Sequence, residues 1–407
     1  MNPQAVQRRT LIVVSSAQVM SGFGLAAGIT VGALLATEVW SSAAAAGVPA
    51  VIMTVGASLA ALAIARVSDH RGRRVGLAVG YGAGALGAVG IVVGGQSGGV
   101  ALLLASFLVY GAGSAANLQA RFAGADLAPT HRRATAMAIV LMATTAGAVL
   151  GPVSARWSGE TVAGWGLNPL LGPFVVAGAA YALGAVVLAA LLRPDPLLTS
   201  RALVAGATAA SSPAVDPRRW RVPVAGGIGL MVIGQAVMVA IMTMTPVHLT
   251  AHSHGIGAVG AVIAWHVAAM YVPSPLSGWL VDRWGPAPVA AASGAVLAAA
   301  GVVAAAGGGA LGPISVALVL LGVGWSLAMV AGSAVLAART PVGLRPRLQG
   351  RADALTTLAG ASGAGLAGVV AVQAGYGGLA LAGAAVAVLA VPLALVVRVR
   401  PGTMAAS

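Results

Sequence analysis

A cluster of ionisable side chains interrupts an otherwise apolar sequence at residues 68–77, SDHRGRRVGL. This stretch places Asp69 close to Arg71, Arg73 and Arg74, with Gly72 among them to permit a turn. A carboxylate beside guanidinium groups forms ion pairs, and an exposed pair contributes only about 0–1 kcal/mol. A network of such pairs at the water edge could bias two conformations that differ by a few kcal/mol. The cluster therefore predicts a polar latch that can break and re-form.

Histidine supplies the other titratable chemistry of the chain. His266 is the one titratable group well inside an apolar segment, so it could carry a proton or remain a neutral, hydrogen-bonded ring. His248, His252 and His254 stand together in PVHLTAHSHG, and three imidazoles could bind Zn²⁺ or another divalent metal. The flanking proline and glycine favour a loop, and no carboxylate joins the three rings. A solvated loop or a pH-sensitive outer site is therefore favoured over a metal site.

Uncharged polar side chains recur inside the apolar segments. Gln18, Asn117, Gln235 and Tyr271 could line a central cavity or join helices by hydrogen bonds, and Trp325 could form a cavity wall or ordinary packing. No Gly-x-x-x-x-Gly-Lys phosphate loop is present, and no acids accompany the histidines. The sequence thus predicts neither an enzyme nor an ATP-driven pump, with no cofactor and no resident metal.

The composition requires a lipid environment. Hydrophobic residues make up 59% of the 407 positions and charged residues only 7%, and the mean hydropathy is +0.95. A soluble protein carries about 25% charged residues, and a folded chain of this composition could not keep its apolar surface from water. The net charge of +14 does not indicate nucleic-acid binding, because the arginines are spread in short clusters between apolar runs.

The apolar runs are long enough to cross a bilayer as helices, since about 20 residues span about 30 Å of hydrocarbon. Twelve such runs are predicted, at residues 11–36, 43–66, 76–95, 99–120, 134–155, 170–192, 222–247, 256–281, 288–307, 312–338, 353–373 and 377–397. Every arginine except Arg156 falls on the side of the N-terminus, which makes that side cytoplasmic. We therefore expect an all-α, multi-pass protein of the inner (plasma) membrane with both termini in the cytoplasm.

The twelve runs divide into two halves. Residues 193–221 form the longest stretch without an apolar run, rich in Pro, Ser, Ala and Arg, and are interpreted as a cytoplasmic linker. The predicted domains are a six-helix bundle over residues 1–192 and a second over residues 222–407. The cluster of residues 68–77 has a counterpart in GWLVDRWGPAPV, which follows the second run of the second half. Matching signals at matching places indicate a duplicated, pseudo-symmetric fold.

With these residues, the sequence resembles the major facilitator superfamily, whose loop signature is Gly-x-Leu-Ala-Asp-Arg-x-Gly-Arg-Arg/Lys. The matching positions are Asp69, Gly72, Arg73, Arg74 and Leu77 in the first copy, and Gly278, Leu280, Asp282, Arg283 and Gly285 in the second. The resemblance implies a cytoplasmic lock that holds an outward-open state. Its members would be Asp69, Gly72, Arg73, Arg74, Asp282, Arg283 and Gly285, joined by the acid of the fourth span, Asp126. The expected partners of Asp69 are Arg73 and Arg74, the neighbourhood of Asp126 at the end of the fourth span, and the start of the eleventh span, where a helix N-terminus attracts carboxylate.

The resemblance extends to the fifth span. Gly147, Gly151 and Pro152 in GAVLGPVSA are similar to the Gly-x-x-x-Gly-Pro core of a motif associated with antiporters in the family. The same residues could instead form only a close helix-packing seam. An arginine that the family links to proton transfer is absent from the fourth span, where Phe107 stands in its place.

The expected function is secondary transport by alternating access, namely proton-coupled efflux of small hydrophobic or amphipathic compounds, as in a multidrug antiporter. Alternatives are an uncoupled facilitator or importer of a small metabolite and, as a minor one, a divalent-metal exporter. The expected partners are a small-molecule substrate, protons and membrane lipids, with no nucleic acid and with the chain acting as a monomer.

Overall fold

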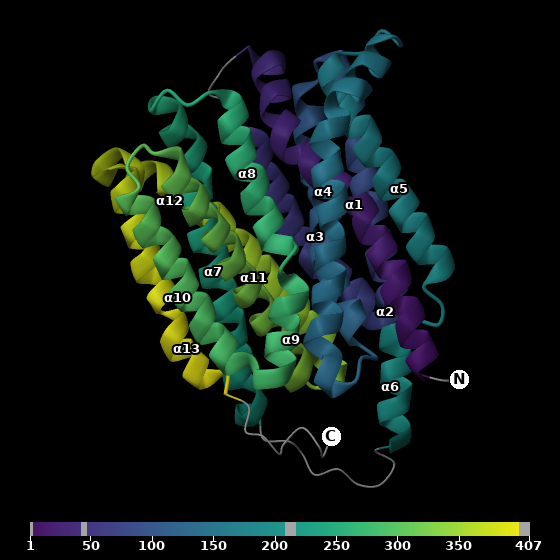
Figure 1. Cartoon of the computed structure of the whole chain (residues 1–407). Coiled ribbons are helices and arrows are strands. Elements are labelled where there is room, and N and C mark those ends of the chain that lie inside the picture. Colours follow the sequence, from purple (N-terminus) through teal and green to yellow (C-terminus); the bar gives the residue numbers. More distant parts are fainter. Residues whose placement is uncertain (1–2, 42–46, 208–216, 399–407) are drawn as a thin grey trace. The chain divides into compact units, whose positions relative to one another are not determined.

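The computed structural model describes residues 3–41, 47–207 and 217–398, apart from the side chains of residues 26–30, 152–153 and 256 (Figure 1). This described part contains helices, turns and no strand. The long helices are α1 (Pro3–Trp40), α2 (Val48–Ser97), α3 (Val100–Ala125), α4 (Arg133–Ala163), α5 (Gly172–Leu191), α7 (Pro217–Ala251), α8 (Ile256–Tyr271), α10 (Pro286–Ala306), α11 (Leu311–Arg339) and α12 (Arg345–Val388). Shorter ones are η2 (Thr130–Arg132), η3 (Pro169–Leu171), α6 (Pro196–Ala207), α9 (Ser274–Trp284), η4 (Val342–Leu344) and α13 (Ala390–Val396).

Membrane-spanning length is a property of most of these helices. Within the described residues, nine helical segments are long and apolar enough to cross a bilayer. The segment of α2 has 50 residues, which at 1.5 Å per residue is roughly 75 Å, more than twice the hydrocarbon thickness. It turns at Gly72, which has φ 87° and ψ 170°, and α12 is interrupted in the same way at Gly375, with φ 70°. The all-helical membrane fold is confirmed, while the count of twelve spans stays a prediction.

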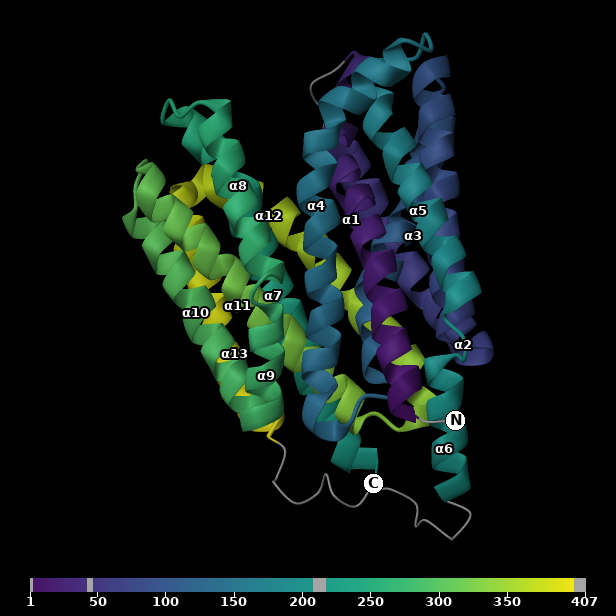
Figure 2. The same ribbon diagram turned by 45° about the vertical axis from the view of Figure 1, so that its right-hand side comes forward.

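The described chain forms two compact units. The first contains Met1–Leu127, Ala143–Ala210 and Pro346–Ala354, and the second contains Ala128–Met142, Ser211–Arg345 and Leu355–Ser407. In the first unit α2 packs against α3 and α5, and α1 packs against α5 and α3 (Figure 2). In the second unit α11 lies between α7, α8 and α10, and α13 packs against α10. Each unit therefore also includes a short segment from the other half of the sequence.

The structure differs from the sequence expectations in two connections. The predicted linker, residues 193–221, contains the helix α6 and the first residues of α7. Helix α6 lies beside the start of α1 (Figure 1). Residues 208–216 of the predicted linker lie outside the described residues. The predicted outer loop is shorter than expected, because α7 continues through Pro246 and His248 to Ala251. Membrane helices tolerate such an internal proline, so the loop prediction at His248 was wrong. The eighth predicted run, residues 256–281, is interrupted between α8 and α9, at Val272 and Pro273.

Candidate functional site

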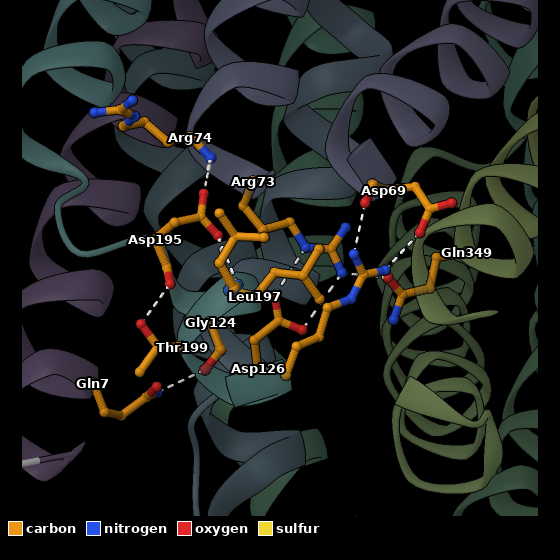
Figure 3. Close-up of polar contacts among 12 residues, drawn as sticks. Gln7, Asp69, Arg73, Arg74, Gly124, Asp126, Asp195, Leu197, Thr199 and Gln349 are labelled. Atoms are coloured by element: carbon orange, nitrogen blue, oxygen red, sulfur yellow. Dashed lines mark hydrogen bonds and ion pairs between the residues drawn. The ribbon is translucent and has the colours of Figure 1, made fainter. Parts of the chain in front are cut away.

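The turn at Gly72 directs Arg73 into the interior of the first unit. The Arg73 side chain has no exposed surface, and its Nε donates to Oδ2 of Asp126 at 2.8 Å. Its Nη2 donates to Oε1 of Gln349, on the second turn of α12, at 2.5 Å (Figure 3). Gly72 must lack a side chain, because its φ is positive and an added Cβ would overlap the carboxylate of Asp195. Arg73 thus joins α2, the end of α3 and the start of α12.

A second, more exposed ionic contact surrounds Asp69. Its Oδ1 accepts from Nη2 of Arg201 at 2.5 Å, and its Oδ2 accepts from Nε of Arg347 at 2.6 Å. The expectation that Asp69 pairs with Arg73 or Arg74 was therefore wrong, because those side chains point elsewhere. Burial by itself would raise the pKa of the Asp69 carboxyl, but hydrogen bonds and charges from Arg201 and Arg347 outweigh it and lower this pKa.

A third ion pair was not assigned from the sequence. Nη2 of Arg121, near the end of α3, donates to Oδ1 of Asp353, on α12, at 2.6 Å, and side-chain exposures are 0% and 1%. The guanidinium carbon of Arg121 lies 4.3 Å from the ring centroid of Phe122, which shields it on one side. The signal that could have revealed the pair is the rarity of acids, since Asp353 is one of only eight in the chain.

Burial changes the energetics expected for this cluster, which we call the ionic cluster and define as Arg73–Asp126, Arg121–Asp353 and Asp69 with Arg201 and Arg347. The sequence predicted weak pairs at the water edge, but the first two pairs are fully enclosed. Removing one partner of a buried pair costs about 3–5 kcal/mol, compared with about 0–1 kcal/mol for an exposed pair. The cluster is therefore a stronger connection between α2, α3 and the start of α12 than its sequence suggested.

Arg74 takes part in this region through its backbone. Its N–H donates to Oδ2 of Asp195 at 2.7 Å, while Oδ1 of Asp195 accepts from the backbone N–H groups of Leu197 and Leu198 at 3.0 and 3.1 Å. Asp195 is thus the N-terminal capping residue of α6. The guanidinium of Arg74 points away from this carboxylate (Figure 3). Arg74 was expected to contribute its charge to the lock, and here it contributes its amide.

The second copy of the loop motif is built differently. Asp282 accepts from the backbone N–H groups of Ala134 and Thr135 at 2.9 and 2.8 Å, so it caps the first turn of α4 within the second unit. Gly285 has φ 83°, as the repeat with Gly72 would require. Arg283 lies over the ring of Trp279, with its guanidinium carbon 5.8 Å from the centroid. The copy therefore pairs a carboxylate with a helix N-terminus, the contact that had been expected of Asp69.

The fifth-helix motif lies on α4. A Cβ added at Gly147 would overlap the carbonyl oxygen of Val19 and come within 2.8 Å of the Cα of Gly22, so α1 and α4 meet backbone to backbone here. Gly151 is buried, whereas the Pro152 side chain lies outside the described residues. The geometry is that of a close packing seam, with small residues at the contact.

Gln18 and Asn117 belong to one buried hydrogen-bond network. The Gln18 amide donates to Thr144 Oγ1 at 3.1 Å and accepts from the hydroxyl of Tyr81 at 2.5 Å, and Asn117 donates to Ser21 Oγ at 2.5 Å. Their exposed fractions are 0% and 1%. In this conformation both amides therefore join helices of the first unit and contact protein instead of an open cavity.

Gln235 and Tyr271 meet at Trp325 in the second unit. The indole Nε1 of Trp325 donates to Oε1 of Gln235 at 2.7 Å, and the Tyr271 ring meets the indole edge to face with centroids 5.6 Å apart. Gln235 is only half-buried. This trio brings together an amide and two buried aromatic rings from three helices, α7, α8 and α11.

His266 is enclosed in the same unit. Its exposed fraction is 0%, and its Nδ1 lies 2.7 Å from the carbonyl oxygen of Leu318. A carbonyl only accepts, so Nδ1 carries the hydrogen and Nε2 of the neutral ring has a free lone pair. Among the described residues, Nε2 has no hydrogen-bond partner.

The three outer histidines have backbone partners. Nε2 of His248 lies 2.6 Å from the Gly308 carbonyl, Nε2 of His254 lies 2.7 Å from the Gly309 carbonyl, and Nδ1 of His252 lies 2.8 Å from the His248 carbonyl. Within the described ranges, no group of three His, Asp or Glu side chains is arranged to hold a metal ion. The histidines act here as connectors of the turn that follows α7.

Comparison with known proteins decides the family. The family model of the Major Facilitator Superfamily matches residues 12–329 and 226–406. The MFS-type transporter YddS of Bacillus subtilis strain 168 is 44% identical to this chain, over 95% of this chain and 90% of its own length. The chain belongs to the major facilitator superfamily. The superfamily consists of membrane transporters that bind small molecules and that are generally not enzymes.

More distant relatives share the fold. The riboflavin transporter RfnT of Brucella anthropi is 26% identical over 87% of this chain and 86% of its own length. The human organic anion transporter MFSD10 has 17% identity and a TM-score of 0.73, and covers 95% of this chain and 99% of its own. The proton:xylose symporter XylE has 14% identity and a TM-score of 0.75, and covers 96% and 95%. At such identities these two structures inform only the fold.

Proposed function

We propose that this superfamily member is a secondary transporter that works by alternating access and exports small hydrophobic or amphipathic compounds in exchange for protons. The observation that supports it most is the distribution of buried charge. Among the described residues, the buried charged side chains are Arg73 beside the kink of α2, Arg121 and Asp126 near the end of α3, and Asp353 on the third turn of α12. An interior without further charge does not suit sugars, which need many hydrogen-bonding partners, or strongly anionic substrates, which need buried arginine.

The ionic cluster would supply the conformational switch. It connects the segment Pro346–Ala354 to α3 by the buried pair Arg121–Asp353, and to α2 by the hydrogen bond from Arg73 to Gln349 and the more exposed pair Asp69–Arg347. The second buried pair, Arg73–Asp126, joins α2 to the end of α3. We propose that these contacts hold one state of the transport cycle and break in the other, with Asp282, Arg283 and Gly285 forming the corresponding contact of the second unit.

His266 is the proposed proton-coupling residue. Its Nε2 is a buried acceptor without a partner in the described structure, so it can take a proton as soon as water reaches it. A charged imidazolium is costly inside a membrane, so protonation and opening of the surrounding helices would be linked. This linkage is what exchange of a proton for a substrate requires.

The trio of Gln235, Trp325 and Tyr271 is the proposed substrate contact in the second unit. The Trp325 indole fixes the amide oxygen of Gln235, which leaves the amide nitrogen as a hydrogen-bond donor beside two aromatic rings. Trp325 is 2% exposed and Tyr271 9% exposed here, so the trio would meet a substrate in a conformation that opens the second unit. It would then suit a flat, largely apolar compound with one hydrogen-bond acceptor. Gln18 and Asn117 would contact a substrate only in a conformation that breaks their hydrogen bonds to Thr144, Tyr81 and Ser21.

Reconstitution in liposomes with an imposed pH gradient tests the proposal. A panel of lipophilic cations and neutral aromatic compounds would be offered to the parent chain and to His266→Gln. Proton-driven flux that is lost in His266→Gln, while binding of the compound persists, is the expected result. Equal flux with and without the pH gradient would contradict the proposed proton exchange. Undiminished proton-driven flux in His266→Gln would show that His266 is not the coupling residue.

An uncoupled facilitator or importer of a small metabolite is the second candidate. One observation favours it, the 26% identity with a riboflavin transporter, whose substrate is a flat aromatic compound with polar groups. Uptake that follows the substrate gradient alone would support it. The divalent-metal exporter is disfavoured by the backbone contacts of His248, His252 and His254.

The proposed arrangement in the cell follows from the arginine distribution. Both termini and the ionic cluster would lie in the cytoplasm, and the chain would act as a monomer in the plasma membrane, with six-helix bundles before and after residues 193–221. Labelling of single cysteines placed in the loops tests this topology, because the chain has no cysteine of its own.

A further inference from the structure

A groove between the second half of α2 and the end of α5 carries two arginines at one end. It is lined by Arg74, Val75, Ala78, Val79, Ala185, Val186, Ala189 and Arg193, and it encloses about 490 Å³. Arg74 begins the α2 side of the groove, and Arg193 ends the α5 side. The other lining residues are alanines and valines. The groove thus has a cationic end and an apolar floor.

Among the described residues, neither guanidinium group forms an ion pair. Within the described part of the chain, no carboxylate lies within 4.0 Å of Arg74 or Arg193. The nearest acid in sequence, Asp195, uses its oxygens on backbone N–H groups of Arg74 and of α6. Arg9 adds a third positive charge nearby, since its Nε donates to the carbonyl of Leu191 at 3.2 Å. This concentration of positive charge is complementary to an anion.

The apolar floor faces outward. Val79 is 50% exposed and Val186 is 61% exposed, although both lie in helices of membrane-spanning length. Alanines at positions 78, 185 and 189 leave the depression between them. In a bilayer these surfaces contact hydrocarbon, so an occupant of the groove must combine an anionic end with an apolar chain.

We propose that this groove binds an anionic phospholipid, with its phosphate between Arg74 and Arg193 and an acyl chain along the alanine and valine floor. Guanidinium binds phosphate in a forked geometry, and an arginine near an anionic leaflet contributes about 1 kcal/mol. The lipid comes from the leaflet on the arginine-rich side. Nothing in this inference depends on the transported compound or on proton coupling, so the two proposals fail separately.

The second unit provides a matched comparison. A groove of about 650 Å³ lies between the start of α10 and α13, lined by Trp284, Gly285, Pro286, Ala287, Pro288, Ala291, Val391, Pro392, Ala394, Leu395 and Arg398. It occupies the position related to the first groove by the sequence repeat, because Pro286 and Ala287 stand where the first copy has its basic pair. It has one arginine instead of two, so we expect it to bind the same lipid much more weakly.

Native mass spectrometry of the full chain in detergent measures this binding. Phosphatidylglycerol would be titrated against three proteins: the parent chain, the double variant Arg74→Gln/Arg193→Gln, and the single variant Arg398→Gln. Phosphatidylcholine and inorganic phosphate serve as comparison ligands. Loss of two charges should weaken phosphatidylglycerol binding about 30-fold, whereas Arg398→Gln should change it less than about threefold. Lysine at both positions should restore most of the affinity.

Several results would overturn the inference. One is an equal affinity of the parent and the double glutamine variant for phosphatidylglycerol. Another is that the parent binds phosphatidylcholine as tightly as phosphatidylglycerol. The third is that inorganic phosphate displaces phosphatidylglycerol at a concentration similar to that of the lipid. Ala189→Trp keeps both charges and fills the apolar floor, so it must also lose the lipid. This variant provides the test if the double glutamine variant does not fold.

Discussion

Replacing Arg121 by Gln should destabilise the protein far more than replacing an exposed arginine. The change leaves the carboxylate of Asp353, which is 1% exposed, without the guanidinium 2.6 Å away. Breaking a buried pair in this way costs about 3–5 kcal/mol, a large part of the roughly 5–15 kcal/mol that stabilises a typical fold. If the pair exists in only one state of the transport cycle, the same energy shifts the balance of the two states by roughly 100- to 4,000-fold.

The matched control is Arg156→Gln. Arg156 pairs with Glu160 at 2.8 Å on the surface of α4, with side-chain exposures of 90% and 65%, and its loss should change stability by less than about 1 kcal/mol. A third variant, Arg121→Met with Asp353→Leu, replaces both charges by apolar groups and should recover most of the lost stability, because no charge then stays buried.

Denaturant unfolding in detergent, followed by tryptophan fluorescence, measures these differences, since the chain has eight tryptophans. The reasoning is refuted if Arg121→Gln costs no more than Arg156→Gln. It is also refuted if the doubly apolar variant is no more stable than Arg121→Gln, because the cost would then not come from an uncompensated charge.

Three further changes test the packing around the site. Gly147→Ala should lower the thermal unfolding temperature and the yield, because its methyl group would overlap the Val19 carbonyl; an unchanged melting temperature would contradict the close seam. Asp282→Ala should cost about 0.5–2 kcal/mol in thermal unfolding, and Asp282→Asn less, since the cap of α4 is then partly kept. Tyr81→Phe should cost about 0.5–1.5 kcal/mol, because Gln18 Oε1 loses the Tyr81 hydroxyl but still accepts from Asn117 Nδ2 at 3.2 Å; equal stability would mean that water replaces the hydroxyl.

The features that the sequence predicts well are those with a local cause. The turn at Gly72 and its repeat at Gly285 follow from a glycine between two apolar runs, and both have positive φ. Membrane-spanning length follows from composition alone. By contrast, His248 was placed in a loop because of the preceding proline, and the structure keeps it in α7. A proline breaks a helix in water more readily than in a membrane, where neighbouring helices satisfy the freed carbonyl.

The partners within the ionic cluster could not be predicted, because no local spacing relates them. Asp69 contacts Arg201 and Arg347 at separations of 132 and 278 residues. The burial of Arg73 and Arg121 could not be predicted from the sequence either. Arginines at the ends of apolar runs usually mark the cytoplasmic side of a membrane protein, and their number says nothing about burial. Arg121 and Asp353 are enclosed where the start of α12 lies against α2 and α3, which are far from it in sequence.

Cysteine labelling at position 65 tests the central claim, which is that the contacts of Pro346–Ala354 with α2 and α3 break during the transport cycle. Ala65 is 2% exposed and is covered by α12. The two helices are so close here that a Cβ added at Gly350 of α12 would overlap the methyl group of Ala65. The chain has no native cysteine, so a maleimide reports Ala65→Cys alone. We predict slow labelling in the parent, at least tenfold faster labelling with Arg121→Gln, and no change with Arg156→Gln. Equal labelling rates in all three backgrounds would contradict the proposal that this ionic cluster controls access.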